Sequence, residues 1–176
     1  MLHLTRIDIN RDDFPTTGHY PFSLDIFQKT RSLKLTTQVT FFVGENGTGK
    51  STLLEAVARR CGIHIWGEIE RERAVVNRYE KAMYCAVGVE WSKGSVPGSF
   101  FASQTFRNYT KLIDEFAASD PAHLEHYGGK SLLTHSHGQS LMSYFTNRYK
   151  IKVLYFLDEP ETALSPKTQV ELLDLI

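Results

Sequence analysis

Apolar positions in the first part of the chain alternate with polar ones, which is typical of short, half-buried strands. An opening strand with imperfect alternation is predicted on four apolar residues, Leu2, Leu4, Ile7 and Ile9. Further strands are predicted over 22–26 and 33–35, and a more continuously apolar one over 39–43. Because only short turns separate these segments, we expect an antiparallel β subdomain at the N-terminus.

Later in the chain, apolar residues recur every three or four positions, which predicts amphipathic helices. Helices are expected over 51–58, 68–83 and 105–118, with one opened by Gly138 and one that follows Pro166. The helix over 105–118 should bury a stripe made of Phe106, Tyr109, Ile113 and Phe116.

Two further segments between these helices have predictable structures. Two apolar segments, 86–91 and 99–103, flank turn residues at 92–98 and predict a hairpin. Residues 123–136 are rich in polar side chains and contain Gly128-Gly129, so they predict a polar loop.

Length and charge narrow the classes of protein. The 176 residues predict a single domain, 1–176, and the 20 Lys and Arg residues balance the 20 Asp and Glu residues. This balance gives no global basic field, so nucleic-acid binding is unsupported by charge, although a local basic patch stays open. No apolar run approaches the roughly 20 residues that span a bilayer, so we expect no membrane segment in this chain.

The two cysteines, Cys61 and Cys85, occur without a secretory signal, which indicates reduced thiols in a cytoplasmic protein. We expect both to be buried small apolar residues rather than partners in a disulfide or a metal site.

The run Gly44-Glu45-Asn46-Gly47-Thr48-Gly49-Lys50-Ser51, followed by Thr52, fits the phosphate-binding pattern G-x-x-x-x-G-K-S/T. Its glycines allow consecutive N–H groups to point at phosphate oxygens, and the helix that follows directs its positive dipole end at the same anion. Lys50 is expected to reach the β- and γ-phosphates, and the Ser51 hydroxyl to ligate Mg²⁺. The run predicts a nucleoside triphosphate site; a glycine-rich turn without a ligand is the alternative.

A second candidate site follows the apolar run 153–157, which describes a strand buried on both faces, as in a parallel sheet. Asp158 and Glu159 come at its carboxyl end, where open α/β sheets bind ligands. Asp158 is then placed for Mg²⁺, through water, and Glu159 to orient and deprotonate an attacking water. In the alternative interpretation both carboxylates only cap the following turn.

Two single residues add to these sites. Tyr20 lies at the edge of the predicted antiparallel sheet and is a candidate to stack on adenine, although a packed or half-exposed tyrosine is the commoner case. Ser136 precedes the helix opened by Gly138, where it offers a hydroxyl and N–H groups to an anion. A local helix cap is the alternative for Ser136.

Three runs resemble the motifs of ABC-type ATPases, in the family's order. His135-Ser136-His137-Gly138-Gln139 resembles the Leu-Ser-Gly-Gly-Gln signature, with Ser136, Gly138 and Gln139 matching and both histidines departing from it. Asp158-Glu159-Pro160 matches the acidic strand end, and Ala163-Leu164-Ser165-Pro166 looks like the loop that follows, with Ser165 where an aspartate is usual. Gln104 is similar to the family's glutamine that senses Mg²⁺. The chain looks closest to the small soluble AAA-family ATPases of ABC type.

This resemblance implies an α/β P-loop fold with a mostly parallel central sheet flanked by helices, beside the N-terminal antiparallel subdomain. It implies ATP and Mg²⁺ as cofactors, Glu159 as the catalytic residue, and a metal site that includes Ser51, Asp158 and Gln104. It also implies an ATP-induced, head-to-tail homodimer, in which the signature motif of one protomer closes on the γ-phosphate held by the other. Hydrolysis would then drive a change in an unidentified effector or partner protein.

Two alternatives stay open: an ATP-binding subunit of a membrane transporter, and a nucleotide-gated interaction module that does not hydrolyse ATP. In the family, a further strand ends in a switch histidine that contacts the γ-phosphate. The sequence stops at Ile176 on the apolar face of a predicted helix, so we expect the domain to be incomplete at its C-terminus.

Overall fold

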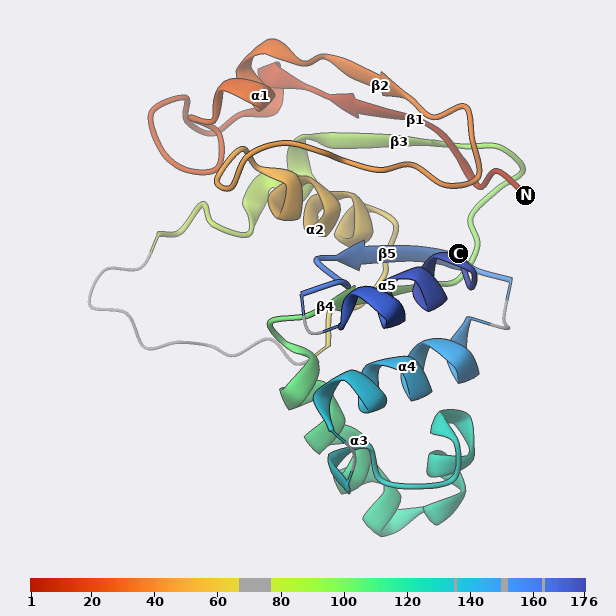
Figure 1. Ribbon diagram of the computed structural model, residues 1–176. Coiled ribbons are helices and arrows are strands. Elements are labelled where there is room, and N and C mark those ends of the chain that lie inside the picture. The colour runs from red at the N-terminus through yellow and green to blue at the C-terminus, as the bar shows by residue number, and fades with distance from the viewer. Residues whose placement is uncertain (67–76, 135, 150–151, 163) are drawn as a thin grey trace. The chain divides into compact units, whose positions relative to one another are not determined.

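The structure, a computed structural model, describes residues 1–66, 77–134, 136–149, 152–162 and 164–176 (Figure 1). It is mixed α/β, with a small antiparallel sheet and a two-stranded parallel sheet.

The chain divides into two compact units, which are described separately. Unit 1 comprises the described residues of Met1–Ile65, Arg71–Phe100 and Leu154–Phe156. Unit 2 comprises those of Trp66–Glu70, Phe101–Val153 and Leu157–Ile176.

The antiparallel sheet of unit 1 has the strand order β2-β1-β3, in which β1 is Leu4–Ile9, β2 is Ser32–Lys34 and β3 is Val87–Trp91. The predicted opening strand, the short strand near 33 and the antiparallel subdomain are therefore confirmed. An irregularity in the β1–β3 register between Leu4 and Arg6 explains the imperfect alternation. Such a bulge adds one residue to the strand and changes the side-chain phase, and Leu4, Ile7 and Ile9 are all buried.

The strand predicted over 22–26 is wrong. A turn leads instead into the short helix α1, Asp25–Lys29, which follows the 3₁₀ helix η1, Arg11–Asp13. Phe22 and Phe27 are both fully buried, and Gln28 Nε2 donates to the Phe22 carbonyl at 2.5 Å. The alternating pattern does not indicate a strand here, because a short apolar run can equally belong to a turn that leads into a helix.

The strand predicted over 39–43 is also wrong, since this segment is irregular. Val39, Phe41 and Val43 are 38%, 67% and 92% exposed. Both edges of β1 are already occupied by β2 and β3, and an apolar run forms a strand only where a partner strand supplies its hydrogen bonds.

The helix α2, Lys50–Arg60, confirms the helix predicted over 51–58. It runs beneath the three-stranded sheet (Figure 1), contacts β3, and packs against the 3₁₀ helix η2, Ala82–Ala86. Its buried face carries Leu53, Ala56, Val57 and Ala58. Much of the helix expected over 68–83 lies outside the described residues. Residues 78–81 form turns, so the end of that prediction is wrong.

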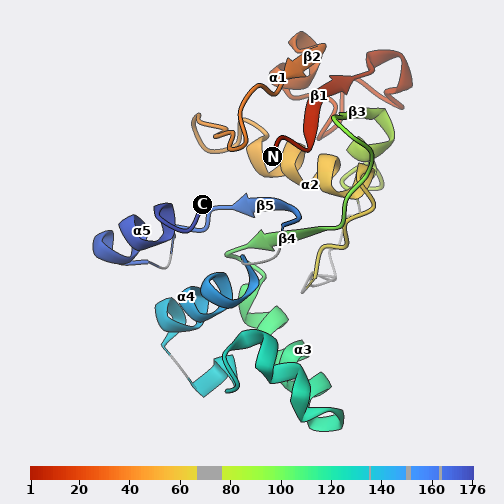
Figure 2. The same ribbon diagram turned by 90° about the vertical axis from the view of Figure 1, so that its right-hand side faces the viewer.

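The predicted hairpin is wrong, because its two strands belong to different sheets. Strand β4, Gly98–Ala102, pairs with β5, Leu154–Asp158, and the two run in the same direction (Figure 2). Leu154 N–H donates to the Pro97 carbonyl at 3.0 Å, and Ser103 N–H donates to the Asp158 carbonyl at 3.2 Å. β3 pairs with β1 instead of β4, so the residues between β3 and β4 connect two sheets rather than forming a hairpin turn.

Unit 2 is largely helical. Its helices are α3 (Phe106–Ser119), η3 (Pro121–Tyr127), η4 (Leu132–Thr134), α4 (His137–Arg148) and α5 (Pro166–Leu173). The predicted helices over 105–118, from Gly138 and after Pro166 are confirmed. The buried residues of this unit form one cluster: Phe101, Phe106, Ile113, Tyr127, Leu132, Leu141, Tyr144, Phe145, Leu164 and Leu172.

Two details of unit 2 differ from the expectations. Phe116 is 49% exposed, and the buried stripe of α3 continues through Thr110 and Ala117 instead. The segment predicted as a polar loop over 123–136 is not simply a loop, because its described residues include most of η3 and all of η4 and bury Tyr127 and Leu132 in the core. Two large apolar residues decide the packing there despite the polar side chains around them.

Among the residues that the structure describes, no helix is long and apolar enough to cross a membrane.

Candidate functional site

The phosphate-binding pattern lies in a tight, exposed loop of unit 1 that leads directly into α2. Gly47 and Gly49 have φ angles of 79° and 98°, in the left-handed region that favours glycine. Thr48 Oγ1 donates to the Glu45 carbonyl at 2.9 Å and closes the loop on itself. Gly49 is the N-cap of α2, so the N-terminal N–H groups of the helix follow the loop directly.

Lys50 bends back over the same loop. Its Nζ donates to the carbonyl oxygens of Gly44 and Glu45, each at 2.8 Å. These contacts hold the ammonium group against the first two residues of the loop. The arrangement therefore combines a charged donor, backbone N–H groups and a helix dipole, which together favour a phosphate.

The helix α1 supports this loop, a contact that sequence reasoning missed. A Cβ atom added at Gly49 would lie 3.0 Å from Leu24 Cδ1, 3.3 Å from Ile26 Cγ2 and 3.3 Å from Phe27 Cζ. Position 49 therefore favours glycine for two reasons: its φ is positive, and a side chain there would press against Leu24, Ile26 and Phe27.

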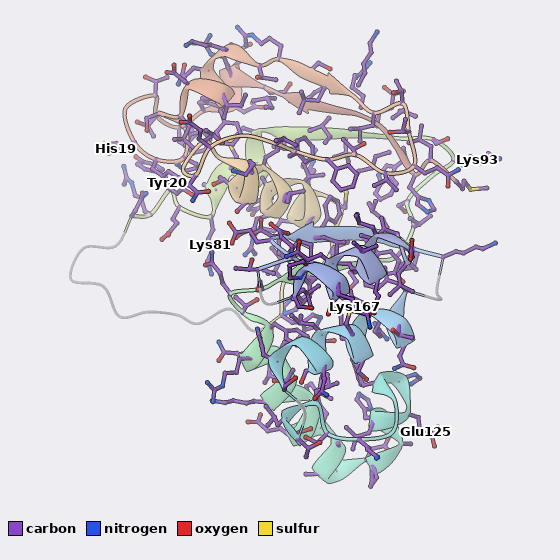
Figure 3. All side chains as sticks on the ribbon, in the orientation of Figure 1. His19, Tyr20, Lys81, Lys93, Glu125 and Lys167 are labelled. Atoms are coloured by element: carbon purple, nitrogen blue, oxygen red, sulfur yellow. The ribbon has the colours of Figure 1, made fainter. Side chains whose placement is uncertain are left out.

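Tyr20 lies beside the first turn of α2 (Figure 3). Its hydroxyl and the Thr52 Oγ1 are 2.7 Å apart and share a hydrogen bond, and its side chain is 42% exposed. The half-exposed alternative for this tyrosine is confirmed, while the stacking role stays a prediction. From the other side, Asn77 Nδ2 donates to the Tyr20 carbonyl at 2.9 Å.

Next to Tyr20, an aromatic cluster joins two segments that are distant in sequence. The rings of His19 and Tyr79 are stacked, with centroids 5.8 Å apart and an interplanar angle of 24°. The Arg78 guanidinium lies over the Tyr79 ring, 4.7 Å from its centroid. Sequence reasoning missed this cluster, because no local pattern relates positions 19 and 79.

The acidic strand end lies in unit 2 and has the predicted position on a strand. Asp158 ends β5 and is 8% exposed, and Glu159 follows with φ 49°, which among the described non-glycine residues is the only positive value. The Glu159 carbonyl accepts hydrogen bonds from the Thr162 hydroxyl at 2.7 Å and from its N–H at 3.3 Å. The strand is less buried than predicted, since Leu154, Tyr155 and Leu157 are only half-buried.

Gln104 is exposed in the turn between β4 and α3. Its neighbour Ser103 donates to the Asp158 carbonyl, so the ends of β4 and β5 meet at one edge of the parallel pair. Within unit 2, the structure thus brings the Gln104 turn and the acidic strand end to the same edge.

Ser136 caps the N-terminus of α4. Its Oγ accepts from Gln139 N–H at 3.4 Å, and Gln139 Oε1 accepts from Ser136 N–H at 3.1 Å. This is a reciprocal capping box, whose Ser-x-x-Gln pattern is visible in the sequence. Gly138 lies half-buried in the first turn, and the His137 ring meets Phe106 edge-on with centroids 6.0 Å apart. His135 of the signature run and Ala163 of the later loop lie outside the described residues.

The serine of the third run also caps a helix. Ser165 Oγ accepts from Thr168 N–H at 3.3 Å, and Pro166 occupies the first turn of α5. The apolar face expected on this helix is present but largely exposed: Leu172 is buried, while Val170 and Leu173 are each 59% exposed.

The cysteines are both free thiols, and the expectation that both are buried is wrong for Cys85, which is exposed. Cys61 is half-buried at the C-cap of α2, and burial raises its pKa to about 11. In unit 2, burial also raises the pKa of Tyr109, with help from Tyr144 and from the hydrogen bond to Tyr127, so its phenol stays neutral. Within the described residues, no cluster of three or more His, Cys, Asp or Glu side chains could hold a metal ion.

The predicted site residues thus fall into two groups: the loop 44–52 in unit 1, and Gln104, the Ser136 cap and Asp158-Glu159 in unit 2. The fold and these residues define a mixed α/β protein with a glycine-rich loop at a helix N-terminus and an acidic strand end. No family model, curated protein or solved structure matches the chain.

Proposed function

We propose that this protein binds ATP in the loop 44–51 and hydrolyses it with Mg²⁺. The observation that carries the proposal is the loop in front of α2, in which Gly47 and Gly49 are left-handed and the Lys50 ammonium is held over the turn. Few other backbone arrangements present several N–H groups and one lysine to a single anion.

The present hydrogen bonds of Lys50 are ones that it could give up in favour of a phosphate oxygen. Its two acceptors, the carbonyls of Gly44 and Glu45, are neutral and exposed. A phosphate oxygen offers the same ammonium a charged acceptor, and such hydrogen bonds are about twice as strong as neutral ones. Lys50 can therefore turn from the loop to the γ-phosphate with a net gain in free energy.

Hydrolysis is assigned to the acidic strand end. Asp158 is a buried carboxylate at the carboxyl edge of the β4–β5 pair, and Gln104 lies in the turn at that same edge. Oxygen ligands of this kind suit Mg²⁺, so these two residues are the metal ligands proposed within unit 2, and the Ser51 hydroxyl is the one proposed at the loop of unit 1. Glu159 is the proposed general base, held on a turn by the hydrogen bonds from Thr162.

The rest of the proposal concerns assembly. ATP closes a head-to-tail homodimer in which Ser136, Gly138 and Gln139 of each protomer meet the γ-phosphate bound by the other, and hydrolysis moves a partner protein. The exposed N-terminus of α4 supports this role, because its N–H groups and the Ser136 hydroxyl are donors that suit an anion. A cytoplasmic location agrees with two free thiols.

The test measures Mg-ATP binding by calorimetry and phosphate release by a coupled assay, on the same preparations. Lys50→Ala should weaken binding by roughly tenfold or more, because one charge-assisted contact is lost, whereas Lys93→Ala, an exposed lysine after β3, should not. Glu159→Gln should bind ATP normally and lose turnover by roughly 10²- to 10⁴-fold. The control Glu161→Gln, at an exposed neighbour, should keep it.

Equal ATP affinity in Lys50→Ala and the parent would contradict the assigned loop. Unchanged turnover in Glu159→Gln would remove this residue from the mechanism. Tight Lys50-dependent binding without sustained phosphate release would favour the nucleotide-gated interaction module over the ATPase.

A further inference from the structure

We propose that Asn46 is a site of spontaneous covalent modification, at which the side-chain amide converts to a carboxylate while the loop 44–51 is empty, and that the modified loop no longer binds phosphate. The reaction is deamidation through a cyclic imide that includes the Gly47 nitrogen. The consequence for phosphate rests on the proposed function, whereas the modification itself does not depend on it.

The sequence distinguishes Asn46 from every other asparagine of the chain. It is followed by Gly47, whereas Asn10, Asn77, Asn108 and Asn147 are each followed by Arg or Tyr. The imide forms when the backbone nitrogen of the next residue reaches the side-chain carbonyl carbon of the asparagine. A glycine hinders this approach least, because it has no Cβ and few backbone restrictions.

The structure leaves this pair of residues open. Thr48 Oγ1 donates to the Glu45 carbonyl at 2.9 Å, so Asn46 and Gly47 are the two residues between the ends of a closed turn. Both are exposed, and a Cβ added at Gly47 would meet no atom within 4 Å. In the part of the chain that the structure describes, neither the Asn46 amide nor the Gly47 N–H takes part in a hydrogen bond. Both reacting groups are therefore accessible to each other and to water.

The other asparagines are held or hindered. The Asn77 amide bonds to two backbone groups, at 2.9 Å and 3.0 Å, and Asn147 Nδ2 donates to a backbone carbonyl one turn earlier in α4 at 2.8 Å. Asn108 lies inside α3, where the N–H of the next residue is bonded to a carbonyl at 3.1 Å. Asn10 is exposed like Asn46, but a bulky residue, Arg11, follows it.

The reaction balances with water as the co-reactant. The Gly47 nitrogen loses its proton and forms a bond to Asn46 Cγ, the Cγ–Nδ2 bond breaks, and Nδ2 takes up a proton and leaves as ammonia. Water then opens the imide at one of its two carbonyls. Opening at Cγ gives an aspartyl residue, and opening at the backbone carbonyl gives an isoaspartyl residue, whose main chain is longer by one atom. No group is oxidised or reduced.

Both products oppose an anion in the loop. Each adds a carboxylate, which repels a phosphate. The Lys50 ammonium, now bonded to the neutral carbonyls of Gly44 and Glu45, gains a charged acceptor within its own loop, and such hydrogen bonds are stronger than neutral ones. The isoaspartyl product also displaces the N–H groups that follow it. A bound phosphate chain, in turn, would engage these N–H groups and exclude water, so we expect it to protect Asn46.

The test incubates the protein at mildly alkaline pH, alone, with Mg-ATP and with adenosine, and maps its peptides by mass spectrometry over time. Without nucleotide, half of Asn46 should convert before any other asparagine changes detectably. An isoaspartate-specific methyltransferase should label the product, because direct hydrolysis of the side chain would give an aspartyl residue alone. Mg-ATP should slow the conversion, and adenosine, which has no phosphate, should not.

Two variants with the same change test the effect on binding by calorimetry. Asn46→Asp reproduces the aspartyl product and should bind Mg-ATP roughly tenfold or more weakly than the parent, because like charges face each other. Asn10→Asp adds the same charge at an exposed position outside the loop and should bind as the parent does. Asn46→Gln resists cyclisation, because it would need a larger ring, so its affinity should be the same before and after incubation. Thermal unfolding midpoints identify any loss of binding that is due to misfolding.

The outcomes separate the two proposals. Conversion of another asparagine ahead of Asn46, or a product without isoaspartate, would overturn the modification site. Equal conversion with and without bound Mg-ATP, or equal ATP affinity in Asn46→Asp and Asn10→Asp, would overturn the link to phosphate. Failure of the parent to bind Mg-ATP would reject the proposed function together with that link, whereas the conversion of Asn46, measured without ligand, would still establish the modification.

Discussion

The glycine-rich loop 44–51 of unit 1 and the acidic strand end of unit 2 each contain left-handed backbone but depend on different parts of the molecule. Each has a residue in the left-handed region, Gly49 with φ 98° and Glu159 with φ 49°. The loop is largely exposed and is closed by a contact within a few residues, from Thr48 to the Glu45 carbonyl, although Gly49 also lies close to Leu24, Ile26 and Phe27. Asp158, by contrast, is buried at the end of a strand that follows the helices of the aromatic core.

The two candidate sites therefore depend on their sequence in different ways. The turn of this loop is encoded by its own glycines, so substitutions at its exposed positions should change ligand binding more than the free energy of unfolding. A buried carboxylate at the end of a strand depends on the packing around it, so substitutions in the core of unit 2 should act mainly through stability. Three pairs of variants test this contrast.

The largest effect is expected from Tyr144→Ala in unit 2. Tyr144 is 2% exposed, and its ring lies near those of Phe101, Phe106, Tyr109, Tyr127, Phe145 and Tyr149. Its removal leaves a cavity among rings that cannot collapse together, and should lower the free energy of unfolding by about 3–5 kcal/mol. Urea denaturation measures this loss.

The control for Tyr144 is Phe116→Ala, an aromatic residue of α3 that is 49% exposed. It should cost less than about 1 kcal/mol, because little buried surface is lost. Equal losses in the two variants would mean that the aromatic cluster does not stabilise unit 2 in the way that its burial indicates.

The same contrast explains which features could be predicted from the sequence. Helix α2 and the caps Ser136 and Ser165 follow local rules of glycine, capping and apolar spacing, and the structure has them. β4 was expected to pair with β3, but it pairs with β5 more than fifty residues later, according to the strand order. Strand partners depend on the whole fold, and local periodicity carries no information about them.

The candidate site divides in the same way. The loop 44–51 could be predicted as a candidate site because its pattern is contiguous. The approach of Leu24 and Phe27 to Gly49, and the stack of His19 on Tyr79, join distant segments and could not be predicted. The apolar run 39–43 had the composition of a strand but is exposed, since composition does not supply a hydrogen-bonding partner. A single sequence therefore proposes local motifs more readily than it predicts which distant segments become neighbours.

An intermediate effect on stability is expected from Gly49→Ala, which tests whether the loop needs a glycine with a positive φ next to α1. The new Cβ would meet Leu24 Cδ1 at 3.0 Å, and alanine is strained at φ 98°. A left-handed non-glycine residue costs about 1–2 kcal/mol, and the contact with α1 adds to it. Thermal and urea unfolding should show this loss together with weaker nucleotide binding.

Gly18→Ala is the matched control, because a Cβ there meets nothing within 4 Å and its φ is not in the left-handed region. Its stability should stay within about 0.5 kcal/mol of the parent. If Gly49→Ala were equally harmless, the loop would not need the observed backbone, and its assignment as a rigid anion site would fail.

The smallest effect on stability is expected from Ser136→Ala, and its comparison with Ser165→Ala separates a structural from a functional role. Each serine caps a helix of unit 2 through one N–H contact, at 3.4 Å and 3.3 Å. Loss of an N-cap hydroxyl costs about 1 kcal/mol, so urea denaturation should give similar losses for both variants.

Association of the protein with Mg-ATP, measured by sedimentation velocity, then distinguishes the two serines. If Ser136 only caps α4, both variants should associate equally, because both lose the same local contact. The proposed dimer predicts that Ser136→Ala alone weakens association, since only this hydroxyl and the α4 N-terminus would meet the phosphate bound by a second protomer. Equal association in the two variants would restrict Ser136 to its capping box, and the active site would then have to be completed within one chain.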